Sequence, residues 1–283
     1  MRWPWIPTGS TAVGQRLASL CAPSMKKLHL ELGGKDAFVV CEDADLDVAV
    51  PGVAWAGLLN CGQVCTSTER VYVQERLYEE FVDRLVKYVR TLRLGDPLQP
   101  TTDIGPMARE TYRARVEAQV AEALQRGAQA LTGGRRPPGL PRGYFYEPTV
   151  LVDVQRDMQV MREETFGPVL PIMPYETVEQ AIHLANDTAY GLGANIYTRN
   201  AGYVKRFAEE VRVGTLWVND PLTDNDAGPF GGMKMSGFGR ELGEEGLEEF
   251  RQTKHIHWDF AMVEKPWWYP YERRSRLRAK GQA

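Results

Sequence analysis

The sequence predicts an α/β fold in three layers, in which a largely parallel β-sheet carries helices on both faces. Two observations support this prediction. Strand-like and helix-like segments alternate along most of the 283 residues, and this order builds a parallel sheet covered on both faces. The segment 36–41, Asp-Ala-Phe-Val-Val-Cys, is apolar enough to form a strand buried on both sides.

The first elements surround two glycine-rich turns. Thr8-Gly9-Ser10 forms a turn that opens a helix over residues 14–21. Residues 28–32 alternate apolar and polar side chains as a strand does, and they bring Glu31 to the end of that strand. A helix over 45–59 and a strand over 69–74 follow.

The middle of the sequence repeats the same alternation. A helix with one apolar face is expected where large apolar residues recur every three or four positions, at Leu77, Phe81, Leu85, Val89 and Leu92. Another covers 109–126 and ends at Gly127. Two more begin at Thr177 and Asn200. Strands are expected between these helices, at 145–154, 192–198 and 214–219.

Composition excludes several classes of protein. Apolar residues make up 43% and charged residues 25% of the sequence, as in ordinary globular proteins. A net charge of −3 offers no basic surface for nucleic acid. The sequence contains neither a run of apolar residues that could span a membrane nor a secretory signal. We therefore expect a cytoplasmic protein with reduced thiols and without nucleic-acid or membrane partners.

A carboxylate and a thiol stand beside glycines in two nearby stretches. Glu31 opens Glu-Leu-Gly-Gly-Lys at 31–35, and Cys65 closes Gly-Gln-Val-Cys at 62–65. A thiolate can form a covalent intermediate, and a carboxylate can activate the water that releases it. The glycines allow the backbone to approach a ligand closely. We therefore interpret Cys65 and Glu31 as two halves of one catalytic site.

Together these two stretches resemble the aldehyde dehydrogenase family. The resemblance extends over nearly the whole sequence, and it includes Glu-Glu-Thr-Phe-Gly-Pro at 163–168 and the glycine-rich stretch at 229–243. It implies oxidation of an aldehyde to a carboxylic acid. Cys65 would form a thiohemiacetal, hydride transfer would convert it into a thioester, and water activated by Glu31 would hydrolyse the thioester.

The resemblance also implies NAD or NADP as the cofactor. Glu164 would hold the nicotinamide ribose hydroxyls, and Phe166 would pack near the nicotinamide ring. The helix that follows Ser10 would turn its free N–H groups toward the pyrophosphate. The residues assigned to the cofactor are Gly9, Ser10, Leu32, Gly33, Glu164 and Phe166.

The residues assigned to the substrate are Val64, Thr66, Asp220 and Asp224. The two aspartates belong to the loop at 220–226, which corresponds to the aldehyde-facing loop of the family. Its carboxylates would repel an anionic semialdehyde, so we prefer a cationic aldehyde or an amino aldehyde. The sequence leaves open which aldehyde is used and whether the cofactor is NAD or NADP.

The sequence departs from the family before residue 8. The family places an oxyanion-binding Asn and the adenosine-binding residues well before Thr-Gly-Ser, whereas this sequence has Met-Arg-Trp-Pro-Trp-Ile-Pro there. We expect residues 1–34 to be the remnant of a nucleotide-binding domain and 35–235 to be the catalytic domain. Residues 236–283 would supply a return segment, an oligomerisation strand at 253–260 and a tail. The 283 residues would then be a truncated form with low activity, and the full-length form would be a homodimer or homotetramer.

Other functions remain open. The chain could be a non-catalytic remnant that acts as a binding or interaction module, or a thiol-based ester hydrolase without a cofactor. We expect no metal site, because Cys61 and Cys65 lack a second pair of ligands, and His255 and His257 are only two.

Overall fold

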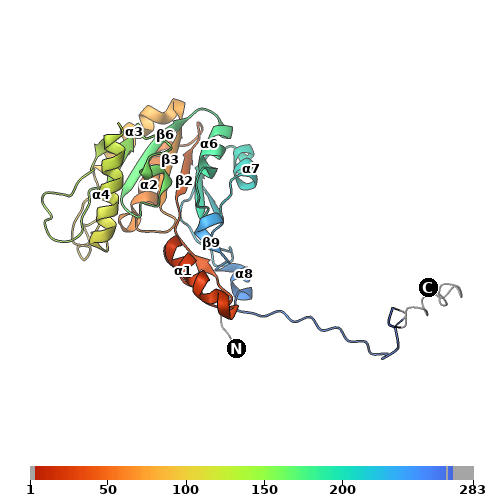
Figure 1. Cartoon of the computed structure of the whole chain (residues 1–283). Coiled ribbons are helices and arrows are strands. Elements are labelled where there is room, and N and C mark those ends of the chain that lie inside the picture. Colours follow the sequence, from red (N-terminus) through yellow and green to blue (C-terminus); the bar gives the residue numbers. More distant parts are fainter. Residues whose placement is uncertain (1–3, 266, 270–283) are drawn as a thin grey trace. The chain divides into compact units, whose positions relative to one another are not determined.

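The computed structural model describes residues 4–265 and 267–269, and the chain divides into two compact units, Met1–Phe250 and Arg251–Ala283. The first unit contains a seven-stranded sheet with the strand order β4-β5-β6-β3-β2-β7-β8 (Figure 1). Neighbouring strands from β5 to β8 are parallel, and only β4, at one edge, is antiparallel to its neighbour. The predicted sheet, with helices on both faces, is confirmed.

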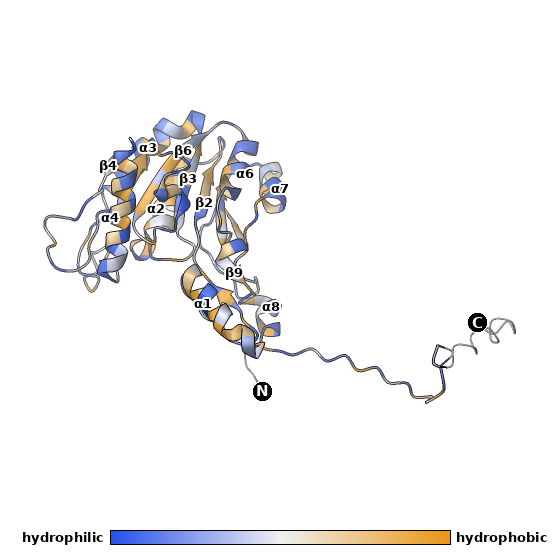
Figure 2. Cartoon of the chain, viewed as in Figure 1, coloured by the Kyte–Doolittle hydropathy of each residue, from blue (hydrophilic) through white to orange (hydrophobic). Residues whose placement is uncertain are grey.

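The strands are short, and those at the centre of the sheet are buried. Every residue of β2 and β3 is buried, and hydrophobic residues are frequent in both (Figure 2). Burial on both faces explains the apolar run of β2, whereas β3 also carries Glu69 and Arg70, which are buried in hydrogen bonds. The seven strands are β2 (Asp36–Val40), β3 (Thr68–Gln74), β4 (Gln129–Thr132), β5 (Thr149–Val152), β6 (Val169–Tyr175), β7 (Gly193–Tyr197) and β8 (Thr215–Val218).

Helices cover the sheet on two sides. The helices are α2 (Leu46–Leu58), α3 (Glu75–Val89), α4 (Glu110–Gln125), α5 (Gln159–Arg162), α6 (Val178–Asn186) and α7 (Ala201–Glu210). Helices α2 and α3 pack on each other and on β3 and β6. After β6 the chain runs in the opposite direction along the sheet, from β6 to β7 and β8. For right-handed crossovers this reversal places α6 and α7 on the other face, and α6 packs against β2 and α7 against β8.

Side-chain caps begin the helices where the sequence predicts them. The side chain of Asp45 accepts from the N–H of Asp47 before α2, and that of Thr177 accepts from the N–H of Gln180 before α6. The Asn200 side chain caps α7 in the same way. Gly127, with φ of +99°, follows α4 in the left-handed conformation that glycine adopts without strain.

A small module adjoins the sheet within the first unit. It comprises α1 (Thr11–Cys21), η1 (Ala22–Ser24), β1 (Leu30–Glu31), η3 (Lys234–Ser236), β9 (Gly237–Phe238) and α8 (Gly243–Glu248). Strands β1 and β9 pair antiparallel, with Glu31 opposite Gly237. This pairing brings the glycine-rich stretch at 229–243 beside Glu31, although the two are far apart in sequence.

The segment 5–9 lies along β1 and the residues before it, although it contains Pro7. Trp5 bridges Leu28 and Thr8 bridges Glu31, both in parallel orientation. The carbonyl of Pro7 accepts from the N–H of Glu31, but Pro7 has no N–H to donate in return. Pro7 therefore removes one hydrogen bond from this pairing but does not prevent it.

Several boundaries differ from those predicted. Helix α1 begins at Thr11 and not at residue 14, because Ser10 caps it by accepting from the N–H of Val13. Gly14 lies inside the helix, where an added Cβ would lie 2.6 Å from Cδ1 of Leu32. The strands expected at 28–32 and 145–154 shorten to β1 and β5, since only their central residues form ladders.

Three strands differ from those predicted. Strands β4 and β6 were not predicted, and β6 contains Pro171 and Pro174, which argue against an interior strand. Strand β5 pairs with β6 only as far as Pro171, so Pro174 has a strand on one side alone. The strand expected at 253–260 is absent, because a strand needs a ladder and the described residues provide no pairing for it. The end of the tail, 270–283, lies outside the described residues.

Candidate active site

Cys65 lies on a loop that joins α2 to β3. The loop starts in η2 (Leu59–Gly62), where Asn60, Cys61 and Gly62 have φ of +51°, +58° and +71°. Three consecutive left-handed residues turn the chain sharply, at a cost of strain for the two that are not glycine. An added Cβ at Gly62 would collide with the backbone of Gly167, so this position requires glycine.

Side chains hold the Cys65 loop in place. The Gln63 amide donates to the carbonyl of Asn60 at 3.1 Å and accepts from the N–H of Ala108 at 2.9 Å. Beyond the cysteine, the N–H of Ser67 donates to the carbonyl of Val64 at 3.0 Å. Cys65 is half-buried, whereas the other three cysteines are buried, and all four are free thiols. Among the cysteines, Cys65 therefore offers the accessible sulfur.

The stretch 31–35 packs against this loop. An added Cβ at Gly34 would lie 2.5 Å from the carbonyl oxygen of Cys65 and 2.8 Å from Oδ1 of Asp36. No larger residue fits between these groups. The two stretches that the sequence analysis assigned to one site are thus in contact, and Glu31 and Cys65 lie within electrostatic range of each other.

The surroundings of Cys65 disfavour its thiolate. Burial, with smaller contributions from Asp36 and Glu31, raises the pKa of Cys65 to about 11. The N–H of Thr66 acts in the opposite direction. A nucleophilic role would therefore require that the thiol proton be removed when the substrate is bound.

Glu31 is paired with His29. Oε1 of Glu31 lies 2.8 Å from Nε2 of His29, and the two residues are only 5% and 1% exposed. Burial raises the pKa of Glu31, and the contact with His29 opposes that rise. Glu241 raises this pKa and Arg240 lowers it, so the glycine-rich stretch also contributes to the charge around Glu31.

Glu164 lies directly against Gly33 and Gly34. Its Oε1 accepts from the N–H of Gly34 at 3.3 Å, and an added Cβ at Gly33 would lie 2.6 Å from Cδ of Glu164. Burial and, to a smaller extent, the charge of Glu69 raise the pKa of Glu164 to about 7, against the opposing effect of the Gly34 N–H. Three predicted site residues, Glu31, Gly33 and Glu164, therefore converge beside the Cys65 loop.

A buried polar network holds the segment that carries Glu164 and Phe166. The Glu69 carboxylate accepts from the N–H groups of Thr165 and Phe166 at 2.7 and 2.8 Å. Nζ of Lys35 donates to Glu69 at 2.7 Å and to Oγ1 of Thr165 at 2.9 Å. Phe166 has φ of +53° and meets the ring of Tyr112 edge-on. The network fixes this backbone and so orients Glu164 and Phe166.

The sequence analysis did not assign a role to His29, Lys35, Asp36 or Glu69. Lys35 stands in the Glu-Leu-Gly-Gly-Lys motif, which was the available signal. Asp36 is 2% exposed, and its carboxyl group lies against the backbone of Gly193, whose N–H lowers its pKa. Burial raises the pKa of Asp36 well above its usual value. Glu69 gave no local signal, because its partners belong to distant segments.

The other predicted cofactor residues lie at the start of α1 and beside it. Ser10 is engaged in capping the helix, and the N–H of Gly9 donates to the carbonyl of Glu31. Leu32 is buried against Gly14. Gly9 and Ser10 therefore connect α1 to the end of β1, next to Glu31.

The predicted substrate residues form two groups. Val64 is half-buried and Thr66 is buried on either side of Cys65. Asp220 and Asp224 are exposed in the loop after β8. The carboxylates that act on Cys65 are Asp36 and Glu31, and the structure gives no interaction between the two loop aspartates and the thiol within the described residues.

Within the described part of the chain, no group of three or more His, Cys, Asp or Glu side chains is arranged to hold a metal ion. None of the helices in residues 4–265 and 267–269 combines the length and the apolar character needed to cross a bilayer.

Comparison with known proteins identifies the family. Residues 6–256 match the aldehyde dehydrogenase family. The chain is 41% identical over 263 residues to aminoaldehyde dehydrogenase 1, peroxisomal, of Pisum sativum, covering 93% of this chain and 52% of that protein. It is 41% identical over 249 residues to a probable succinate-semialdehyde dehydrogenase [NADP(+)] of Sinorhizobium fredii, covering 88% of this chain and 50% of that protein.

A solved structure gives the same result. The fold resembles that of betaine aldehyde dehydrogenase from Staphylococcus aureus in complex with NAD+, with a TM-score of 0.89 and 35% identity, covering 94% of this chain and 54% of that chain. The chain thus spans about half the length of the relatives it matches. On the family match over residues 6–256, this chain belongs to the aldehyde dehydrogenase family.

Proposed function

We propose that this chain carries the thiol chemistry of an aldehyde dehydrogenase, with Cys65 as nucleophile and Glu31 as general base. The supporting observation is the contact of the stretch 31–35 with the Cys65 loop, in which Gly34 abuts the carbonyl of Cys65. This contact brings a buried carboxylate into range of the half-buried thiol. A nucleophile and a base in one cleft are the two groups that covalent catalysis of this kind requires.

The protein's own residues act in two steps, the attack on the aldehyde and the hydrolysis of the thioester that hydride transfer leaves. In the first, Cys65 loses its proton and its sulfur bonds to the aldehyde carbon, which leaves negative charge on the carbonyl oxygen. In the second, Glu31 takes a proton from water as the water adds to the thioester carbon. The bond between the sulfur and the acyl carbon then breaks, the product leaves as a carboxylic acid, and the proton held by Glu31 restores the Cys65 thiol.

The residues present fit the nicotinamide end of NAD or NADP. Gly33 lacks a side chain where a Cβ would collide with Glu164, so the Glu164 carboxyl group can lie directly against the Gly33 backbone. A carboxylate accepts hydrogen bonds from two neighbouring ribose hydroxyls, which supports Glu164 in that role. Bound NAD(P)+ would accept the hydride that leaves the thiohemiacetal carbon. Phe166, held by Glu69, would limit the position of the ring.

The substrate remains a class of aldehydes. One similar protein is named for aminoaldehydes and another for succinate semialdehyde, and both are 41% identical to this chain. An aminoaldehyde is a cation and succinate semialdehyde is an anion, so the two names favour neither substrate charge. The exposed carboxylates of Asp220 and Asp224 favour a cationic aldehyde, as the sequence predicts.

We also propose that the 283 residues by themselves have low activity, since they span about half the length of each relative. The proposed domain boundaries follow residues 34 and 235. For a full-length form we propose a cytoplasmic location and a homodimer or homotetramer.

The test is NADH and NADPH formation with betaine aldehyde, 4-aminobutyraldehyde and succinate semialdehyde. The chain would be assayed by itself and with the unmatched half of a relative added as a second polypeptide. We expect activity in the wild-type chain that is lost in Cys65→Ser. It should persist in Cys61→Ser, because burial raises the pKa of Cys61 to about 12 and keeps it from reacting. Activity that survives Cys65→Ser, or its absence in both preparations, would contradict the proposal.

A second candidate function is docking of another polypeptide on the small module. Backbone groups of Trp5, Pro7 and Gly9 bond toward β1. The backbone N–H and C=O groups of Ile6 and Thr8 point to the opposite side of the segment, away from β1. There they have no hydrogen-bond partner within the described residues. Such an edge accepts an additional strand. We call this side of the segment the Ile6 edge.

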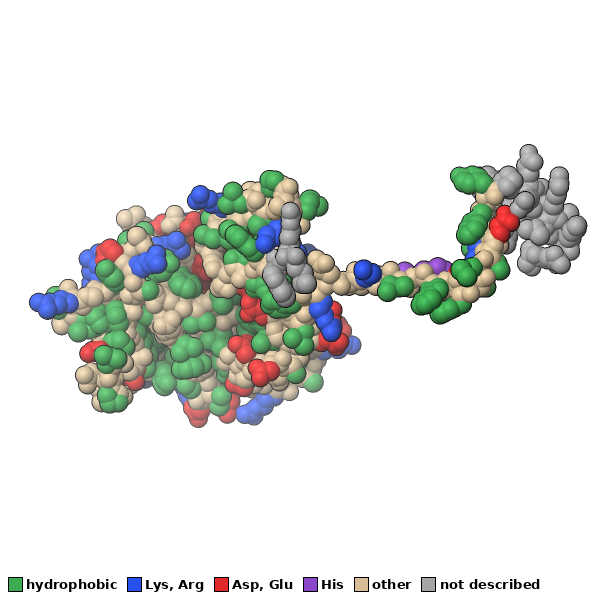
Figure 3. Space-filling view, turned by 90° about the horizontal axis from the view of Figure 1, so that it is seen from below, with side chains coloured by type: hydrophobic (Ala, Val, Ile, Leu, Met, Phe, Trp, Pro, Cys, Tyr) green, Lys and Arg blue, Asp and Glu red, His purple; other side chains and the backbone are tan. Residues whose placement is uncertain are grey.

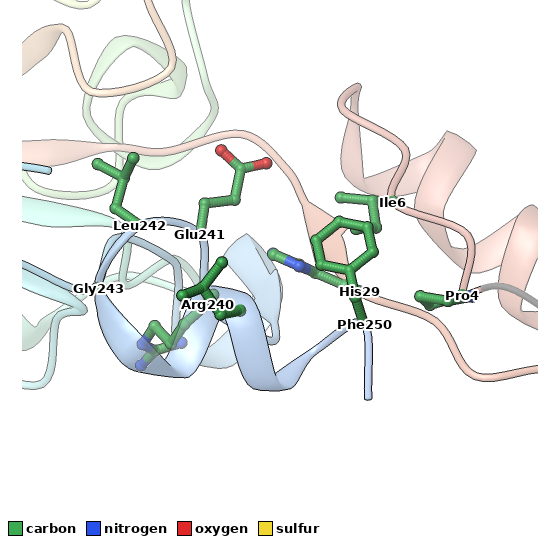
Figure 4. A pocket seen from close by; sticks show the side chains of 10 residues that line it. Pro4, Ile6, His29, Arg240, Glu241, Leu242, Gly243 and Phe250 are labelled. Atoms are coloured by element: carbon green, nitrogen blue, oxygen red, sulfur yellow. The ribbon is translucent and has the colours of Figure 1, made fainter. Parts of the chain in front are cut away.

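An apolar pocket of about 650 Å³ adjoins the Ile6 edge. Ile6, Phe250 and His29 gather at one end of it (Figure 4). Leu247 and Phe250 are 69% and 54% exposed, and hydrophobic side chains form patches on this side of the unit (Figure 3). The occupant we propose is a strand from the nucleotide-binding half of an aldehyde dehydrogenase.

Binding in trans tests this candidate. With the unmatched half of a relative, we expect a complex by native mass spectrometry and slower deuterium exchange at the N–H groups of Ile6 and Thr8. Ile6→Asp should abolish the complex, whereas Leu98→Asp, at a site 87% exposed, should leave it intact. A complex that tolerates Ile6→Asp and leaves exchange unchanged would exclude the Ile6 edge.

A further inference from the structure

His29 is the side chain closest to Glu31 that the proposed reaction does not use. It precedes Glu31 by two residues, so both side chains lie on the same face of their strand. Nε2 of His29 and Oε1 of Glu31 are 2.8 Å apart, and His29 is 1% exposed. A hydrogen bond between two buried groups is protected from competition by water.

The glycine-rich stretch leaves room for this pair. An added Cβ at Gly239 would lie 2.6 Å from the ring of His29, and one at Gly231 would lie 3.0 Å from Oε1 of Glu31. Both glycines have φ in the left-handed range, +94° and +156°. The guanidinium of Arg240 donates to the carbonyl of Gly239 at 2.6 Å and to that of Gly232 at 3.0 Å, which fixes the wall around the pair.

The second ring nitrogen indicates which partner carries the proton. Nδ1 of His29 is buried and has no hydrogen-bond partner among the described residues. An unprotonated Nδ1 without a hydrogen-bond partner costs less free energy than a buried Nδ1–H without one. The cost is greatest when that N–H belongs to a charged ring. The geometry therefore favours a neutral ring in which Nε2–H donates to an ionised Glu31.

We infer that His29 is a positioning residue for Glu31: it holds one carboxylate oxygen by an Nε2–H donor and leaves the other oxygen for the hydrolytic water. This inference rests on the proposed function and adds to it. A donor to the ionised carboxylate also opposes the effect of burial on its pKa. The other groups that act on Glu31 are Glu241, which raises its pKa, and Arg240, which lowers it.

The consequence is a specific pH dependence. A carboxylate base works when it is deprotonated, so its rate rises with pH through its pKa. Loss of the His29 donor would raise the pKa of Glu31 and move the rate profile to higher pH. At a pH below the wild-type midpoint, a rise of about one unit lowers the ionised fraction, and the rate of hydrolysis, by about tenfold, whereas well above the shifted midpoint the rate is unchanged.

The experiment uses p-nitrophenyl acetate, which acylates a thiol without a cofactor. The burst of p-nitrophenolate reports acylation of Cys65, and the steady state reports hydrolysis of the acyl thioester. We expect His29→Phe to keep the burst, to move the pH midpoint of the steady state upward by about one unit, and to slow the steady state about tenfold at a pH below the wild-type midpoint. His29→Gln, which retains an N–H donor near the same position, should restore most of the rate. His183→Gln, an exposed histidine bonded to Arg156, serves as the matched control and should change neither phase.

The outcomes separate the inference from the proposed function. No burst in the wild-type chain, or a burst that survives Cys65→Ser, would overturn the proposed function. A normal burst with an unshifted profile in His29→Phe would overturn the role of His29 alone, as would equal impairment in His29→Gln. Nitrogen-15 NMR of the His29 ring supplies a reading that does not depend on activity. It should show the Nε2–H form, and a proton on Nδ1 instead would contradict the inference.

Discussion

Gly33 and Glu164 touch across the candidate cofactor site: an added Cβ at Gly33 would lie 2.6 Å from Cδ of the Glu164 side chain. The Glu164 carboxylate also accepts from the N–H of Gly34 at 3.3 Å. Glycine at position 33 thus decides where this carboxylate can lie. The contact joins the turn after β1 to the segment after α5. No local sequence pattern indicates that these two segments meet.

Gly33→Ala should displace Glu164 with little loss of stability, because the end of a flexible side chain can move away. We expect the affinity for NAD+ to fall about tenfold or more as the hydrogen bonds of a charged group are lost. Isothermal calorimetry and urea unfolding measure the two effects. Gly139→Ala is the control, since nothing lies within 4 Å of an added Cβ there. Unchanged NAD+ affinity in Gly33→Ala would argue against a cofactor role for Glu164.

Lys35→Met should destabilise the fold strongly. It leaves the Glu69 carboxylate, which is 3% exposed, without its cation, and removal of one partner of a buried pair costs about 3–5 kcal/mol. Lys87→Met is the matched control, because the pair of Lys87 with Asp83 is exposed and worth at most about 1 kcal/mol. Free energies of unfolding from urea titration give both values. Similar losses for the two variants would mean that the buried network is not a structural requirement.

Alkylation of Cys65 should accelerate with pH over a wide range. Its pKa is raised to about 11 by burial and nearby carboxylates, so the thiolate fraction grows about tenfold per unit from pH 7 to pH 10. Iodoacetamide labelling followed by peptide mapping gives the rate. Cys21, Cys41 and Cys61, which are 5%, 1% and 2% exposed, should label only after unfolding. A rate for Cys65 that levels off near pH 8 would show that its thiolate is stabilised in the free protein.

Local sequence patterns predicted most of the sheet. The apolar run at β2 and the caps at Asp45, Thr177 and Asn200 are local signals, and the structure contains the elements they indicate. Strand β6 was missed because Pro171 and Pro174 argue against a strand, yet tertiary packing between β3 and β5 overrides that preference. The expected strand at 253–260 shows the converse, since alternation by itself supplies no pairing partner.

The site was predictable where its residues stand in short motifs. Cys65, Glu31 and Glu164 each lie beside glycines or in a recognisable segment, and the structure brings their segments together. The supporting residues were not predictable in this way. Glu69 binds the N–H of Thr165, and His29 depends on the space left by Gly239, so their roles arise from contacts between distant segments.

The most direct test of the account is the fate of an acyl group on Cys65. The chain would be exposed briefly to p-nitrophenyl acetate, quenched and analysed by peptide mapping, in wild-type form and as Glu31→Gln. A base that activates water typically contributes a factor of about 10²–10⁴ to the rate. Glu163→Gln, which changes an exposed neighbour of Glu164, is the control. We predict that acetyl appears on Cys65 alone, is hydrolysed in the wild type and in Glu163→Gln, and persists in Glu31→Gln. Acetyl on other residues, or equally fast hydrolysis in Glu31→Gln, would contradict the assignment of Cys65 and Glu31 as nucleophile and base.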